Sequence, residues 1–96
     1  MNEKQFRSII DAANTHSFLT YDPCVMEFWT GYIQGVSRLF YGDKFGTEEG
    51  HAEMMASVKS KEETIQRRGA GYVAGFTGVS IEDAMIMAEE GRIMPP

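Results

Sequence analysis

The stretch Gly31-Tyr-Ile-Gln-Gly35 lies inside an apolar segment, and it recurs forty residues later as Gly71-Tyr-Val-Ala-Gly75. A glycine in the middle of a helix costs about 1 kcal/mol relative to alanine, so four of them oppose helix formation by about 4 kcal/mol. Close packing offsets this cost, because helix backbones without intervening Cβ atoms can approach closer than about 8–10 Å. The repeat therefore predicts two helices that pack against each other through their GYxxG faces.

The sequence allows two arrangements for these glycine faces. In the first, the faces join two helices of one chain, with Tyr32 and Tyr72 flanking the crossing. In the second, they join two protomers of a homodimer. We favour the intramolecular contact, because monomers rarely leave large apolar surfaces uncovered.

The helix that contains the first glycine pair has the clearest boundaries in the sequence. Asp22 is a good N-cap, Pro23 suits the first helical position, and Gly42 is a natural stop. Spacing at 100° per residue places one broad apolar stripe on this helix: Val25, Phe28, Trp29, Tyr32, Ile33, Val36, Leu39 and Phe40. The same spacing places the polar residues on the opposite side: Glu27, Thr30, Gln34, Ser37 and Arg38.

The spacing of apolar residues is helical elsewhere too, and no segment alternates strictly. A capping box of Asn2 and Gln5 predicts a helix over 3–14. The connector 15–21 follows, and we expect its apolar side chains to pack onto the core: Phe18, Leu19 and Tyr21. The prediction is an all-α fold, a compact bundle of four to five short helices forming one domain over residues 1–96.

The second half of the chain predicts three further helices. Thr47 caps the first of them, which carries Ala52, Met55 and Val58, and a Ser60–Glu63 capping box opens the second near residue 61. These two could instead be one helix, since no Gly or Pro lies between His51 and Arg68. Ser80 caps the last helix and Gly91 ends it.

Composition limits the classes of protein to consider. The 96 residues carry 14 Asp+Glu against 9 Lys+Arg, a net charge of −5, and 43% of them are hydrophobic, which argues against disorder. No apolar run is long enough for a membrane span, and residues 1–8 lack the apolar core of a secretory signal. The single cysteine, Cys24, allows no internal disulfide, so we expect a cytoplasmic protein.

Two constellations suggest chemistry. Glu48 and His51 have the i, i+3 spacing of metal-binding helices, and Cys24 lies in a first helical turn, where the helix dipole lowers a thiol pKa. The chain lacks a second Glu-x-x-His, an oxyanion motif and a phosphate-binding loop of known spacing. We therefore expect no enzyme, no cofactor and no metal, with a Glu48/His51 metal site as the least favoured alternative.

Residues 71–91 suggest a nucleic-acid function. The segment Val73–Ser80 followed by Ile81–Ala84 resembles the turn of helix-turn-helix proteins, and the Thr77–Ser80 core with the segment 89–95 resembles winged activators of the MerR type. This resemblance implies a DNA-binding regulator. The second helix, however, carries four acidic residues and no Lys or Arg before Arg92, whereas DNA affinity depends on neutralising phosphates. We expect no nucleic-acid partner and keep this function as the alternative.

Surplus apolar surface favours a protein partner instead. Ile86 and Met87 are predicted to point away from the face of their helix formed by Ile81, Ala84, Met85 and Ala88. The sequence predicts a non-catalytic protein that acts through protein–protein interaction, as a homo-oligomer, adaptor or inhibitor of a larger cytoplasmic assembly. The predicted interaction face consists of Gly31, Tyr32, Gly35, Gly71, Tyr72, Gly75, Ile86 and Met87.

Overall fold

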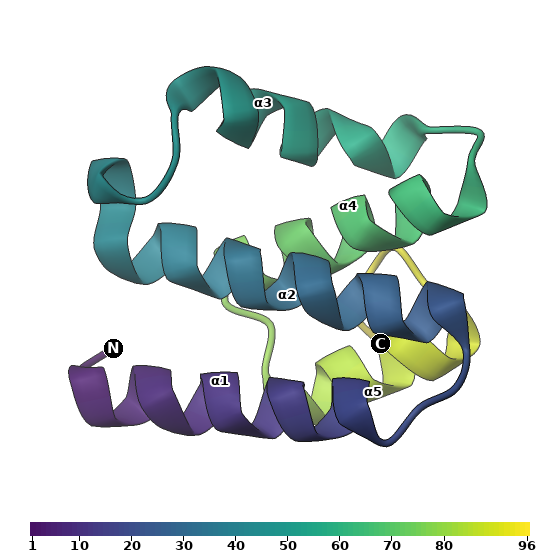
Figure 1. The fold of residues 1–96 in the computed structure, drawn as a ribbon, viewed down its shortest axis with the longest axis horizontal. Helices are drawn as coiled ribbons and strands as arrows, with labels where there is room; N and C mark the ends of the chain where they lie inside the picture. Colours follow the sequence, from purple (N-terminus) through teal and green to yellow (C-terminus); the bar gives the residue numbers. More distant parts are fainter.

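The computed structural model describes residues 1–96, and its regular structure consists only of helices (Figure 1). The α-helices are α1 (Glu3–Phe18), α2 (Pro23–Tyr41), α3 (Glu48–Ala56), α4 (Glu63–Phe76) and α5 (Ile81–Glu90). Two short 3₁₀ turns, η1 (Gly42–Lys44) and η2 (Ser57–Lys59), flank α3. The predicted all-α bundle is confirmed, including the packing of α2 against α4. None of these helices has the length and apolarity that crossing a membrane requires.

Helix α2 lies at the centre of the molecule, with α1 on one side, α3 on the other and α4 beside it (Figure 1). Its predicted boundaries are confirmed: the Asp22 carboxylate accepts a hydrogen bond from the backbone N–H of Cys24, and Gly42 ends the helix with a φ of 61°. The predicted polar side of α2 is wrong in part, because Ser37 and Arg38 are buried. A central helix is covered on several sides, so no side of it faces water along its whole length.

The core is built around three large side chains of α2 that are almost completely buried, Phe28, Trp29 and Tyr32. Small residues of α4 and α5 allow these rings to pack closely, and Phe6 of α1 stacks on Phe40 with ring centroids 4.4 Å apart. The other buried apolar members are Ala13, Val36, Ala70, Ala74, Ala84, Met87 and Ala88. Aromatic residues on one helix opposite alanines on its neighbours thus fill the interior.

Helix α1 begins as predicted, with the reciprocal capping box of Asn2 and Gln5, but it continues to Phe18 rather than residue 14. Only residues 19–22 then separate α1 from α2. The prediction that the connector packs onto the core is wrong: Phe18 is 87% exposed, Leu19 70% and Tyr21 100%. A connector this short turns the chain at the surface and cannot fold back over the core.

The alternative of one continuous helix between residues 47 and 76 is wrong. Helix α3 begins at the predicted Thr47 cap, ends in η2, and is separated from α4 by residues 60–62. The predicted Ser60–Glu63 capping box does not form, because the Ser60 hydroxyl accepts a hydrogen bond from the Glu62 N–H instead. This local turn moves the start of α4 to Glu63. In α5, both predicted caps, Ser80 and Gly91, are present.

Candidate functional site

The four predicted glycines form a glycine interface between α2 and α4, which consists of Gly31, Gly35, Gly71 and Gly75. A Cβ atom built on Gly31 would lie 1.9 Å from the carbonyl oxygen of Arg68, and one on Gly71 would lie 1.9 Å from that of Phe28. A Cβ atom on Gly35 would lie 2.1 Å from the carbonyl oxygen of Tyr72, and one on Gly75 would lie 2.3 Å from that of Tyr32. Such distances are far inside van der Waals contact, so only glycine fits at these positions. The facing residue numbers increase together, which means that α2 and α4 run parallel (Figure 1).

The two glycine motifs are related by internal symmetry. Each residue of the α2 motif has its counterpart forty positions later in α4, and the two tyrosines occupy equivalent buried places, 1% and 3% exposed. The hydroxyl of Tyr32 donates to the backbone carbonyl of Val79 at 2.6 Å, and the hydroxyl of Tyr72 lies 2.7 Å from Nδ1 of His51. One tyrosine therefore holds the turn before α5, and the other holds α3.

These contacts place six residues of the predicted interaction face inside one chain. Gly31, Gly35, Gly71 and Gly75 are buried between α2 and α4, and so are the two tyrosines. Of the two arrangements that the sequence allowed, the structure shows the one in which both glycine faces belong to the same chain. A surface for a partner has to be sought elsewhere on the molecule.

The last two residues of the predicted interaction face, Ile86 and Met87, differ in their exposure. Ile86 is 38% exposed, whereas Met87 is 1% exposed, so the prediction that both point away from the core is wrong for Met87. Helix α5 contacts α1, α2 and α4, and the residues it buries are Ala84, Met87 and Ala88. The buried residues of α5 follow the expected i, i+3, i+4 spacing. The buried face includes Met87, however, instead of being centred on the predicted Ile81, Ala84, Met85 and Ala88.

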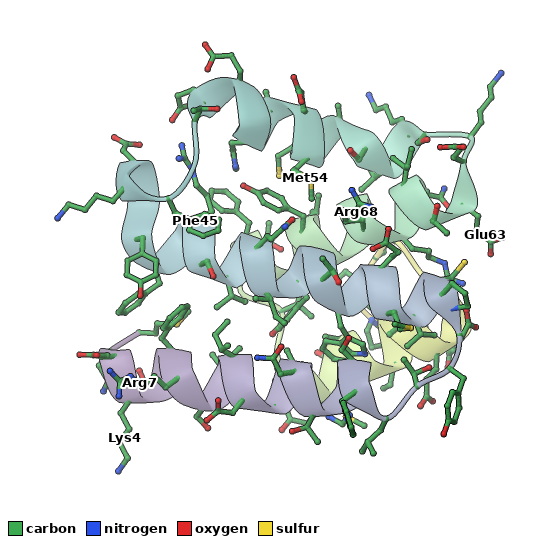
Figure 2. All side chains as sticks on the ribbon, viewed as in Figure 1. Lys4, Arg7, Phe45, Met54, Glu63 and Arg68 are labelled. Atoms are coloured by element: carbon green, nitrogen blue, oxygen red, sulfur yellow. The ribbon has the colours of Figure 1, made fainter.

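Beneath α3 lies a polar cleft that sequence reasoning missed. Figure 2 shows Phe45, Met54 and Arg68 between α3 and the α2–α4 pair, where they line a cleft of about 440 Å³. The Arg68 guanidinium pairs with the carboxylate of Glu27 across the glycine interface. Residues 41 positions apart form this pair, so no local spacing in the sequence could have revealed it.

The two predicted metal ligands, Glu48 and His51, make separate contacts. Glu48 accepts a hydrogen bond from the buried Arg38 guanidinium, which also donates to the carbonyl oxygen of Phe45 at 2.9 Å. His51 packs its ring edge against Phe76, with centroids 4.5 Å apart, besides its contact with Tyr72. No group of three or more His, Cys, Asp or Glu side chains gathers closely enough to hold a metal ion.

Cys24 lies in the first turn of α2, as predicted, but its surroundings do not activate the thiol. Desolvation raises the pKa of Cys24, and the nearby Glu63 carboxylate raises it further by repulsion and a hydrogen bond. The direction is the opposite of the lowered pKa that we expected from the position of the thiol in a first helical turn. The contacts of the two histidines are with aromatic residues: His16 stacks on Trp29 and His51 contacts Tyr72.

The helix-turn-helix interpretation depends on the exposed side of α5. Helices α4 and α5 are joined by the predicted short turn at residues 77–80, so the order of helix, short turn and helix is present. The exposed residues of α5 are Glu82, Ile86, Glu89 and Glu90. This acidic side would face the phosphates of a DNA groove, and repulsion opposes such binding.

The most unusual surface of the molecule is the corner where α1 turns into α2. We call Phe18, Leu19 and Tyr21 the apolar corner; they are the three most exposed large apolar side chains of the structure. Phe18 has no place in the core, and the neighbouring His16 of α1 stacks on Trp29 with ring centroids 5.2 Å apart. The corner residues are therefore excluded from the interior and project into solvent.

A small pocket of about 230 Å³ lies beside the apolar corner. Trp29 and Val25 of α2 contribute to its wall, and the ends of α1 and α5 border it with Leu19 and Glu89. We call this the Trp29 pocket. Protruding apolar side chains next to a recess that contains an indole ring are a combination suited to contact with another macromolecule.

Comparison of the chain with protein-family models, curated proteins and solved structures gives no match.

Proposed function

We propose that this chain is a non-catalytic, cytoplasmic protein that acts by binding another protein through the apolar corner. The observation that carries the proposal is the exposure of Phe18, Leu19 and Tyr21, at 87%, 70% and 100%. Large apolar and aromatic side chains present roughly 150–250 Å² each, so the corner amounts to about 500 Å². Patches of this size are at the upper end for monomers and often mark interaction sites.

The occupant we propose is a different protein rather than a second copy. Acidic residues border the corner: Asp22 follows Tyr21 directly, and Glu89 lies at the mouth of the Trp29 pocket beside Leu19. A two-fold contact would bring these like charges together, at a cost in binding energy. This favours the adaptor or inhibitor role over the homodimer, and the lone cysteine supports a reducing, cytoplasmic setting.

A photocrosslinking amino acid at position 21 tests the proposal, because p-benzoylphenylalanine is close in shape to the fully exposed Tyr21 that it replaces. In the cells that naturally make the protein, we expect one discrete adduct with another protein, and we expect Phe18→Ser to abolish it. The control carries the same crosslinker at Leu39, which is 42% exposed near the opposite end of α2.

Three outcomes contradict the proposal. They are equal adducts from positions 21 and 39, an adduct that survives Phe18→Ser, and an adduct that contains only two copies of this chain. Because Phe18 makes little contact with the core, its replacement leaves the fold intact, and loss of the adduct then reports on binding.

A further inference from the structure

We propose that the partner presents an apolar segment that also carries basic residues, and that the Trp29 pocket receives one of its lysine or arginine side chains. This inference rests on the proposed function of the apolar corner. It specifies the chemistry of the partner, which the exposed apolar surface alone leaves undefined.

The pocket has the layout that a long basic side chain requires. Its inner wall is apolar, formed by Val25, Trp29 and Met85, and the exposed carboxylate of Glu89 lies at its border. Lysine and arginine bury their aliphatic stems against apolar surface while their charged ends stay in water or beside an acid.

Two helix ends make the pocket favourable for positive charge. The last turn of α1 contributes His16, and the last turn of α5 contributes Ala88 and Glu89. The C-terminus of a helix carries partial negative charge from its free carbonyl groups, and α5 has no basic residue in its last turn. Within the chain, the Arg67 guanidinium already donates to the carbonyl oxygen of Ala88 at 3.0 Å, so this helix end binds a guanidinium in the structure itself.

The chain supplies no free cation to Glu89. Arg67, the cation at this helix end, is engaged with the carbonyl oxygen of Ala88 and with Glu63, and Glu89 forms no ion pair within the chain. No Lys or Arg occurs between Arg7 and Arg38, and the acids in that interval are Asp11, Asp22 and Glu27. In the segment after α5, Arg92 lies 3.5 Å from Glu90 and is engaged there. Complementary charge must therefore come from the partner, and this accounts for the basic residues that we assign to it.

Trp29 is the single tryptophan of the chain, so its fluorescence reports on the pocket directly. The probes are synthetic amphipathic helical peptides: one of leucine and lysine, and a matched one in which glutamine replaces every lysine. We expect the lysine peptide to shift the Trp29 emission and to bind at least about fivefold more tightly than the glutamine peptide, with an affinity that falls as salt increases.

Two variants of the full chain locate the charge effect. Glu89→Gln should weaken binding of the lysine peptide by about fivefold and leave binding of the glutamine peptide unchanged. Glu49→Gln, an equally simple loss of an exposed carboxylate in the first turn of α3, should change neither. Both variants alter exposed side chains, so both keep the fold.

The outcomes separate this inference from the proposed function. Equal affinities of the two peptides, both abolished by Phe18→Ser with Tyr21→Ser, overturn the basic partner and leave the apolar corner as a binding surface. Failure of the lysine peptide to bind, or unchanged binding in Glu89→Gln, also overturns the inference. Binding of the lysine peptide that persists without Phe18 and Tyr21 overturns the proposed function itself.

Discussion

At each position of the glycine interface, the place that a Cβ atom would take is already occupied by backbone of the facing helix. The nearest atom is a carbonyl oxygen in all four cases, and a carbonyl group in a helix cannot move aside without breaking its own hydrogen bond. This distinguishes the interface from an ordinary tight core contact, where a flexible side chain yields. The cost of four mid-helix glycines is thus offset by contact between two backbones.

Gly71→Ala should therefore lower the free energy of unfolding by about 3 kcal/mol or more, because its Cβ would lie 1.9 Å from the Phe28 carbonyl oxygen. The measurement is urea unfolding followed by far-UV circular dichroism. Gly50→Ala in α3 is the matched control: its Cβ meets only the Thr47 hydroxyl at 3.2 Å, and helix propensity favours the alanine. A Gly71→Ala midpoint equal to that of the unaltered chain would show that the interface is not close-packed.

The buried Tyr32 should make the stability of the protein fall at alkaline pH. Burial, with a smaller effect of Glu82, raises its pKa from 10.0 to about 12. Between these values the unfolded chain loses the phenol proton while the folded chain keeps it, so the stabilisation is complete below pH 10 and disappears as pH rises toward about 12. Tyr32→Phe should be less stable at neutral pH, through loss of the bond to Val79, and its stability should fall less over this range.

The check is a series of urea midpoints across that pH range for the two proteins. Tyr21→Phe is the control, since the fully exposed Tyr21 should leave the pH profile unchanged. Parallel profiles for Tyr32→Phe and the unaltered chain would rule out Tyr32 as the source of the dependence.

Among the helices, α3 is the one held by polar contacts rather than by burial. It contains no buried residue, and its contacts with the rest of the molecule include the Arg38–Glu48 pair and the His51–Tyr72 hydrogen bond. Helices α2 and α4 bury most of the core between them. Resistance to local opening should therefore differ sharply between these elements.

Hydrogen exchange measures this difference. We expect the amides of α3 to exchange well before those of α2 and α4, and we expect Tyr72→Phe to accelerate exchange in α3, because it removes the hydroxyl that His51 contacts. Tyr41→Phe serves as a control, since Tyr41 lies outside this contact and is 48% exposed. Exchange of α3 in step with α2 would contradict this description of the fold.

Across the whole molecule, the apolar residues of the corner and those of the core should contribute very differently to the free energy of unfolding. Replacing all three corner residues by serine removes more apolar surface than Phe28→Ala, yet it should change the free energy of unfolding by no more than about 0.5 kcal/mol. Phe28→Ala should cost about 3–5 kcal/mol, because Phe28 is completely buried. Urea unfolding of the two variants provides the comparison, and similar losses would show that the corner packs onto the protein.

Several features of the fold follow from local rules and were predictable. The capping box of Asn2 and Gln5, the Asp22–Pro23 start of α2 and the Ser80 and Gly91 caps of α5 depend on residues within a few positions of one another. The glycine repeat also identified which two helices pack together. The end of α1 was missed because no glycine or proline marks it. The start of α4 was missed because the Ser60 hydroxyl accepts from the Glu62 N–H instead of capping the helix.

The candidate site was harder to predict, since exposure depends on what else fills the space. Phe18 looks like a core residue in sequence, yet it is exposed, whereas the neighbouring His16 stacks on Trp29. A sequence signal was nevertheless present: three large apolar residues directly precede the strong helix start at Asp22, which leaves few residues for a connector. Met87 and Arg38 were misplaced for a related reason, because helical spacing gives relative directions but not which neighbours surround the helix.

The amino-acid sequence alone determined the helical class, most helix starts and the close pairing of α2 with α4, because caps and helical periodicity are short-range and a glycine repeat has a steric meaning wherever it occurs. Only the tertiary structure decided that this pairing is parallel and lies within one chain, that Arg38 is buried, and that the α1–α2 corner is left uncovered. These outcomes depend on competition among distant side chains for a limited interior volume, and no local pattern records which of them is excluded.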